Sequence, residues 1–197
     1  MEISTILMIG GVIVIVGVII QISVNSNKKK MFLSEFENIQ NFNSSQKFIS
    51  ENLINAIAID ESTQKICLLS YYQNNINQKI INYNDILSSE LFIDNDTITK
   101  TSRMSQAGGT LVGAALLGGV GAVIGGLSGK KTSSDVVKRI DLRLVINDMS
   151  NPMYDINFLN METKKNSLIY NASLNKARHW SGIIDIVIRN SEKVEVV

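Results

Sequence analysis

The stretch ISTILMIGGVIVIVGVIIQISV, residues 3–24, divides the chain into a membrane anchor and a water-soluble remainder. Every residue from position 6 to position 20 is apolar or glycine, and the flanking residues in this stretch carry no charge. At 1.5 Å per residue, about 22 helical residues cross the roughly 30 Å of hydrocarbon in a bilayer. A helix is expected despite the many β-branched residues, because a lone segment in lipid satisfies its backbone only as a helix. The sequence therefore predicts a single-pass transmembrane anchor over residues 1–27.

A cleaved secretory signal is the competing interpretation of this stretch. Such a signal needs a basic segment before the apolar run and small residues at a cleavage site after it. Here Glu2 precedes the run, and no small-x-small site follows it. These two missing features favour an uncleaved anchor.

Three lysines set the expected orientation. Lys28, Lys29 and Lys30 directly follow the apolar run. Lysines close to a membrane end are retained on the cytoplasmic side. We therefore expect the protein in the cell membrane, with its soluble domain in the cytoplasm.

Composition limits the possible functions of the soluble part. A chain of 197 residues leaves room for one domain beside the anchor. The 19 Lys and Arg residues are balanced by 18 Asp and Glu, so no polycationic surface for nucleic acid is expected. Cys67 is the one cysteine, which excludes an intramolecular disulfide.

The soluble part begins with a stretch, residues 28–54, that we interpret as a short juxtamembrane helix and a linker. Short apolar runs separated by turn residues follow from position 55. They predict seven strands, at 56–59, 65–70, 78–81, 86–93, 97–101, 136–146 and 153–159. This pattern favours a mostly antiparallel sheet or a small barrel.

The end of the chain changes to a helical period. Apolar residues recur at spacings of three and four, with Asn171 or Ser173 as the expected N-cap: Leu174, Ala177, Trp180, Ile184, Val187 and Ile188. The predicted fold class is α+β, with this amphipathic helix closing a domain over residues 55–190 and a tail at 191–197. A strand meander closed by one helix is similar to pleckstrin-homology-like (PH-like) domains. The segment IINYNDILSSEL, residues 80–91, resembles their turn-and-strand segment.

Glycine is concentrated in one uncharged insertion within this domain, residues 107–129. Nine of the thirteen glycines lie between positions 108 and 129. Gly109 and Gly113 are spaced by four, as are Gly121, Gly125 and Gly129, which would leave one helix face open to close approach by another helix. The run GGVGAVIGG, residues 118–126, resembles glycine-zipper sequences of bacterial membrane-associated proteins. With its flanks, the block is similar to one in anchored proteins of Gram-positive bacteria and their phages.

A helical hairpin is the expected form of this insertion. One membrane crossing would separate the predicted strands onto opposite sides of the bilayer. Basic residues also lie on both sides of the insertion, as retention of both of its ends on the cytoplasmic side requires: Lys100, Arg103, Lys130 and Lys131. Two arms of about ten residues are too short to span and would enter one leaflet or pack against a partner. A mobile loop is the alternative, although its apolar residues argue against exposure to water.

No residue set with recognisable chemistry emerges, so we assign no catalytic, cofactor or metal residue. Residues 126–132 fail as a phosphate-binding loop, because Ile124 and Lys131 stand where the motif needs Gly and Ser or Thr. His179 reads as a helix-surface residue and Cys67 as a small buried hydrophobe. The acidic residues Glu90, Asp94 and Asp96 lack the spacing of a calcium loop.

The sequence leaves two main hypotheses for function. The first is a non-enzymatic binding or regulatory module, held at the cytoplasmic face and acting through its β-rich domain and glycine-rich hairpin. Its partners would be membrane lipid and a second copy of the chain or another membrane protein. The second is a phage-type exclusion or defence factor that perturbs the membrane or a host membrane protein. A hydrolase or transferase is the weakest alternative.

Overall fold

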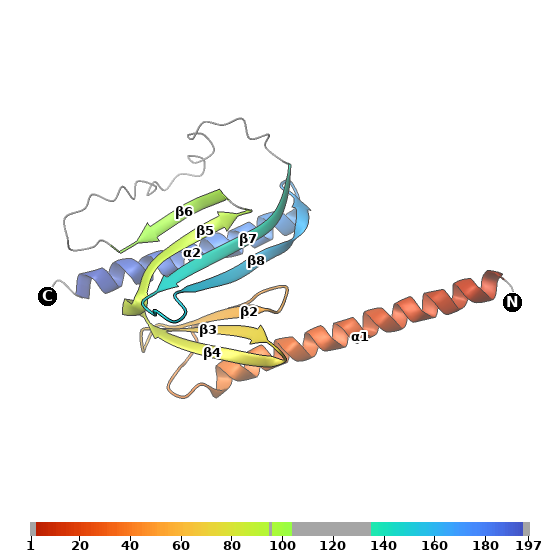
Figure 1. Cartoon of the computed structure of the whole chain (residues 1–197), viewed down its shortest axis with the longest axis horizontal. Coiled ribbons are helices and arrows are strands. Elements are labelled where there is room, and N and C mark those ends of the chain that lie inside the picture. Colours follow the sequence, from red (N-terminus) through yellow and green to blue (C-terminus); the bar gives the residue numbers. More distant parts are fainter. Residues whose placement is uncertain (1–2, 95, 104–134, 195–197) are drawn as a thin grey trace.

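The structure, a computed structural model, describes residues 3–94, 96–103 and 135–194 (Figure 1). This part of the chain contains two α-helices, eight strands and one short 3-10 helix. In chain order they are α1 (Ile3–Asn38), β1 (Gln46–Ile49), β2 (Asn55–Asp60), β3 (Lys65–Tyr72), β4 (Asn75–Asn82), η1 (Tyr83–Asp85), β5 (Ile86–Ile93), β6 (Asp96–Ser102), β7 (Val136–Ile146), β8 (Met153–Lys164) and α2 (Leu168–Val194).

The strands form two four-stranded antiparallel sheets. Sheet A has the order β1-β2-β3-β4, and sheet B has the order β6-β5-β7-β8. The 3-10 helix η1 carries the chain from β4 at the edge of sheet A into β5 of sheet B. The α+β fold was predicted correctly. The alternative between a sheet and a closed barrel resolves to two open sheets within the described ranges.

The main hydrophobic core lies between the two sheets and α2. The last helix packs on β5, β7 and β8 and buries the apolar stripe that its sequence predicts. Sheet A contributes Ile57, Ile59 and Leu68 to the same core. Burying these side chains supplies the main driving force for folding, at about 25 cal/mol for each Å² of apolar surface removed from water.

A second apolar cluster covers the outer face of sheet A. Successive strand residues point to opposite faces, so Ala56 and Ala58 face outward while Ile57 and Ile59 enter the main core. The outer cluster consists of Phe32, Phe36, Ile39, Phe42, Ala56, Ala58, Cys67 and Leu69. The C-terminal part of α1 supplies Phe32 and Phe36, and the segment that follows the helix supplies Ile39 and Phe42. The inner strand β2 is therefore buried on both faces, whereas the edge strand β4 is mostly exposed.

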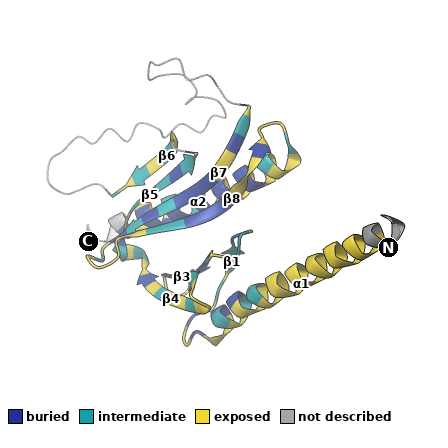
Figure 2. Cartoon of the chain, turned by 45° about the vertical axis from the view of Figure 1, so that its right-hand side comes forward, coloured by how far each residue is buried: buried dark blue, intermediate teal, exposed yellow. Residues whose placement is uncertain are grey.

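The anchor and the expected juxtamembrane helix are one continuous helix of 36 residues. No glycine or proline occurs between positions 18 and 41, so nothing in the sequence interrupts the helix where it leaves the apolar run. Figure 2 shows α1 exposed along most of its length and buried only where it meets sheet A. In the described part of the chain, α1 is the one helix long and apolar enough to cross a membrane.

Two local predictions were wrong. Strand β1 lies in the stretch expected to be a linker, and it pairs with β2 along its whole length. Helix α2 begins at Leu168, one turn earlier than predicted, and continues to Val194. The cap is Ser167, whose hydroxyl accepts a hydrogen bond from the Tyr170 amide at 3.1 Å, rather than Asn171 or Ser173.

Candidate functional site

The junction between α1 and sheet A fixes the domain to the anchor. Phe32 is fully buried and Phe36 is 2% exposed. Their rings pack against the small side chains of Ala56 and Ala58 and against Cys67. The apolar part of α1 therefore continues without a flexible linker into the part of the helix that belongs to the folded domain.

The three lysines predicted to set topology lie on α1 just after its apolar part. Lys28 is half-buried, and its Nζ lies 4.3 Å from the centre of the Tyr71 ring, which is a cation–π contact. Lys29 and Lys30 are exposed. The orientation inferred from these lysines remains a prediction.

A cleft of about 610 Å³ separates this part of α1 from strand β1. Its walls include Asn25, Ser26 and Lys29 of α1, Lys47 of β1 and Lys176 of α2. A second cleft, of about 440 Å³, continues between the loop after β1, strand β8 and the start of α2. Sequence reasoning missed both clefts, because their residues come from elements far apart in the chain and carry no shared local pattern.

The charges in the first cleft are mainly positive. Lys176 pairs with Glu51 at 3.1 Å. Lys29 and Lys47 make no ion pair with any residue in the described ranges. Three ammonium groups therefore share the cleft with one carboxylate.

Strand β6, which precedes the glycine-rich insertion in the chain, lies next to α2. The edge strand β6 is joined to α2 by side chains at regular intervals: Thr99 lies 3.3 Å from Ser181, and Thr101 donates to Asp185 at 2.9 Å. Arg103 donates to the Ser191 hydroxyl at 2.7 Å, and Ser191 is buried. Arg103, the last residue described before the insertion, is thus held by the last helix.

The chain re-enters sheet B at the opposite end. Strands β6 and β7 both pair antiparallel with β5, so they run parallel to each other on either side of it. Ser102 lies opposite Ser88, and Ile140 lies opposite Ile93. Val136 therefore lies about nine residue steps from Ser102, roughly 30 Å along the sheet at about 3.3 Å per residue. The five spaced glycines, Gly109, Gly113, Gly121, Gly125 and Gly129, lie outside the described residues.

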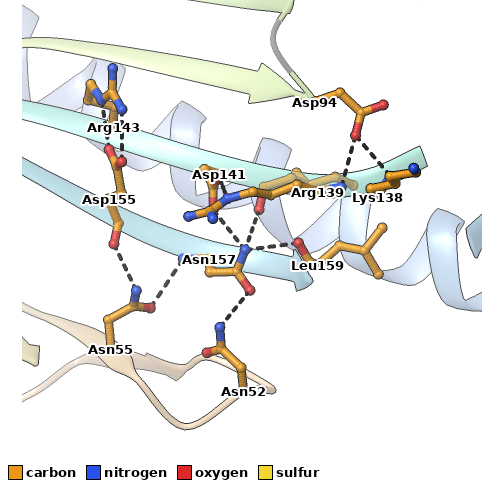
Figure 3. Close-up of polar contacts among 11 residues, drawn as sticks. Asn52, Asn55, Asp94, Lys138, Arg139, Asp141, Arg143, Asp155, Asn157 and Leu159 are labelled. Atoms are coloured by element: carbon orange, nitrogen blue, oxygen red, sulfur yellow. Dashed lines mark hydrogen bonds and ion pairs between the residues drawn. The ribbon is translucent and has the colours of Figure 1, made fainter. Parts of the chain in front are cut away.

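A polar network joins the two sheets beside the main hydrophobic core (Figure 3). The Asn157 amide group donates to Asp141 at 2.7 Å and to the Leu159 carbonyl at 2.8 Å. Asn52 donates to the Asn157 side chain at 3.2 Å, and Asn55 accepts from the Asn157 backbone at 3.1 Å. These bonds satisfy buried polar groups and fix the loop before β2 against β8, which is a structural role.

Ion pairs extend the same surface along sheet B. Arg143 donates to both carboxylate oxygens of Asp155, at 2.7 and 2.8 Å, and Arg139 pairs with Asp141. Asp94 accepts from the amides of Lys138 and Arg139, and Glu90 pairs with Lys100. Glu90 and Asp94, two of the three carboxylates considered for calcium, are thus bound to structural partners.

The remaining side chains with possible chemistry stand apart from one another. Cys67 is fully buried, and burial raises the pKa of its thiol to about 12, with a further rise from the charge of Glu35. His179 is exposed on α2, with Nε2 2.9 Å from the Gln46 amide oxygen. Both match their predicted environments. Residues 126–132, compared above with a phosphate-binding loop, lie outside the described part, and within that part no cluster suited to a metal occurs.

Comparison with known proteins decides the family. The family described as "Glycine zipper containing PH domain" matches residues 44–160, which run from just before β1 into β8 and include the glycine-rich insertion. The chain belongs to this family. The description of this family contains both predicted resemblances, to PH-like domains and to glycine zippers.

Two relatives come from one phage and its integrated form. An immunity protein of Bacillus phage SPbeta is 32% identical over 151 residues, covering 70% of this chain and 72% of that protein. The SPbeta prophage-derived uncharacterized membrane protein YomJ of Bacillus subtilis strain 168 is 32% identical over 151 residues, covering 70% of this chain and 63% of that one. No solved structure matches the chain. The family to which the chain belongs therefore includes a phage immunity protein and a prophage-derived membrane protein.

Proposed function

We propose that the protein is a membrane-tethered, non-enzymatic binding module that acts at the cytoplasmic face through its β-rich domain and glycine-rich segment. The observation that carries this proposal is the continuous helix α1, which joins the apolar anchor to the outer face of sheet A. In such an arrangement the domain acts only near the bilayer. We include residues 28–54 in the acting unit, because β1 and the end of α1 belong to sheet A and its outer layer.

The glycine-rich segment is the proposed site of self-association or of contact with a membrane-protein partner. Spacing by four along 121, 125 and 129 supports close helix packing, as in small-residue faces of membrane helices. The geometry of sheet B permits a hairpin whose two ends meet. Positions 103–106 and 130–135 give ten connecting residues, and an extended chain of this length reaches about 35 Å, enough for the roughly 30 Å between the ends of β6 and β7.

A phage-type exclusion role is the specific form that we favour, because one relative is a phage immunity protein. In this form the tethered domain and the glycine-rich segment engage the membrane or a host membrane protein and so protect the cell that makes them. Membrane tethering raises the local concentration of the domain near such a target.

A plaque assay tests this role. The full chain is expressed in Bacillus subtilis cells that lack the SPbeta prophage, and the cells are challenged with SPbeta phage. We expect the efficiency of plating to fall at least tenfold. Unchanged plating at verified membrane expression would overturn the exclusion role.

Three variants in the same assay test the glycine-rich segment. Gly125→Leu adds bulk to the proposed packing face, so protection and cross-linked oligomers should both fall while the protein stays in the membrane. A Gly-Ser linker in place of residues 108–129 should have the same effect. Gly182→Leu is the matched control, because an added Cβ meets nothing within 4 Å at this exposed position of α2. Equal cross-linking in all variants and the wild type would refute a zipper.

A further inference from the structure

The end of the domain that faces the bilayer is defined by α1. The apolar side chains of α1 from Met8 to Val24 are exposed and cover no part of the domain. The boundary of the bilayer's hydrocarbon core therefore falls near Val24. Figures 1 and 2 both show the turn between β8 and α2 on the side of the domain toward which the anchor extends. This turn therefore points toward the membrane surface.

The turn carries an exposed apolar tip. Leu168 is 88% exposed, Ile169 is 53% exposed and the nearby Met161 is 55% exposed. Lys164 ends β8, Lys165 begins the turn, and both are exposed. Large apolar side chains flanked by lysines are typical of surfaces that enter the interface of an anionic membrane.

The first cleft lies at the level of the lipid headgroups. Asn25 and Lys29 line it, and they follow Val24 by one and five helical residues. At 1.5 Å per residue they lie about 1.5 to 8 Å beyond the hydrocarbon, if α1 is close to the membrane normal. The headgroup region is roughly 5–8 Å deep on each side of the bilayer, so Asn25 and Lys29 lie at the depth of the headgroups.

We propose that this end of the domain is a lipid-binding surface for anionic phospholipid of the phosphatidylglycerol class. Leu168 and Ile169 enter between the headgroups, and Lys29, Lys47 and Lys176 receive a lipid phosphate in the cleft. Two of these lysines lack an ion-pair partner in the described ranges, which leaves their charge available to an anion. Docking at this surface, in addition to α1, fixes the angle of the domain to the bilayer. The proposal deepens the binding role by naming a lipid class, and it rests on α1 spanning the bilayer, whichever side the domain occupies.

The test places an environment-sensitive fluorophore on Ile169→Cys in the full chain, reconstituted in nanodiscs. Native Cys67 is buried and does not compete for the label. With 30% phosphatidylglycerol in phosphatidylcholine, the emission should shift to the blue, and lipid-borne nitroxide should quench it at least threefold more than in pure phosphatidylcholine. A label on Met149→Cys is the control, because Met149 is fully exposed in the turn at the other end of β7 and β8. Equal quenching at positions 169 and 149 would overturn the proposal.

Lysine variants test the cleft itself. Lys29→Gln and Lys47→Gln should each reduce the effect of phosphatidylglycerol on the position-169 label, whereas Lys79→Gln, whose ammonium pairs with Asp148 in the turn between β7 and β8, should not. If all three substitutions had equal effects, the response would come from the general surface charge, and the cleft would not be the binding site. Inorganic phosphate at 10 mM with pure phosphatidylcholine discs distinguishes a soluble anion from a lipid. If phosphate alone reproduces the shift, the lipid assignment is wrong.

Discussion

Replacing Phe36 with alanine should loosen the contact between α1 and sheet A. The ring is 2% exposed and lies in the outer cluster with Cys67. Truncating a buried phenylalanine to alanine costs about 3–5 kcal/mol. If this loss falls on the α1 contact, the population with α1 detached rises by roughly 10² to 10⁴, since about 1.4 kcal/mol corresponds to a factor of ten.

Cys67 reports this detachment directly. It is fully buried against α1, and its raised pKa further slows its reaction with thiol reagents. In the detergent-solubilised full chain, a thiol reagent should modify Cys67 faster in Phe36→Ala by the same factor, up to the rate of the exposed thiol. Trp180 fluorescence checks that the main core remains folded during the measurement.

Met31→Ala provides the matched control on the same helix. Met31 is 40% exposed, so its truncation should change stability by only about 0.5 kcal/mol and the Cys67 rate by about two- to threefold. Equal Cys67 rates in Phe36→Ala and Met31→Ala would refute the conclusion that α1 covers the outer face of sheet A.

Three further outcomes follow from the same structure. A chain that begins at Asn25 should leave the membrane fraction in high salt and alkaline wash; full retention would instead identify a second anchor. Hydrogen bonds from Ser62, Asn43 and Thr63 hold the pKa of buried Asp60 below its usual range, so its stabilisation is present above the unfolded pKa of about 3.9 and is lost as pH falls below that value. The free energy of unfolding, measured by urea titration between pH 6 and 2.5, should therefore fall less steeply with decreasing pH in Asp60→Asn than in the wild type. The same pH dependence in both proteins would contradict this role. Trp180→Ala should lower the free energy of unfolding by about 3–5 kcal/mol, because Trp180 is 4% exposed in the main core. Its exposed neighbour His179 provides the control, since His179→Ala should lower that free energy by less than about 1 kcal/mol in the same denaturant titration.

Periodicity predicted much of the fold because burial leaves a local pattern. The last helix was recognised from its apolar stripe, and seven of the eight strands were recognised from short apolar runs. Strand β1 was missed because QKFI offers only two apolar residues between polar neighbours. Its place in the sheet depends on pairing with β2 and on the stacking of Phe48 against Phe158 at 4.3 Å, which are long-range contacts.

The layer that covers the outer face of sheet A could have been predicted from the sequence. The run AIAI, residues 56–59, is apolar on both faces, which is typical of a strand buried on both sides. Phe32 and Phe36 are spaced by four on the helix that covers it. The composition of residues 25–50, rich in Asn, Ser and Lys, directed the prediction toward a linker instead.

The two clefts could not be predicted from the sequence. Lys29, Lys47 and Lys176 come from three elements, and only the folding of β1 between α1 and α2 brings them together. The spaced glycines, by contrast, are visible in the sequence alone, and their packing stays a prediction that the cross-linking experiment tests.

The most direct test of the central claim is the side of the membrane on which the tethered domain lies. Cys67 cannot report it, because burial shields the thiol in either orientation. Met149→Cys can, since Met149 is fully exposed in the turn between β7 and β8, which lies on the side of the domain away from the N-terminal end of α1 (Figure 1). A cysteine inserted before Glu2 serves as the outside control. With a membrane-impermeant maleimide, we predict that position 149 is labelled only after cells are permeabilised, while the N-terminal cysteine is labelled in intact cells. Labelling of position 149 in intact cells would place the domain outside and contradict a module that acts at the cytoplasmic face.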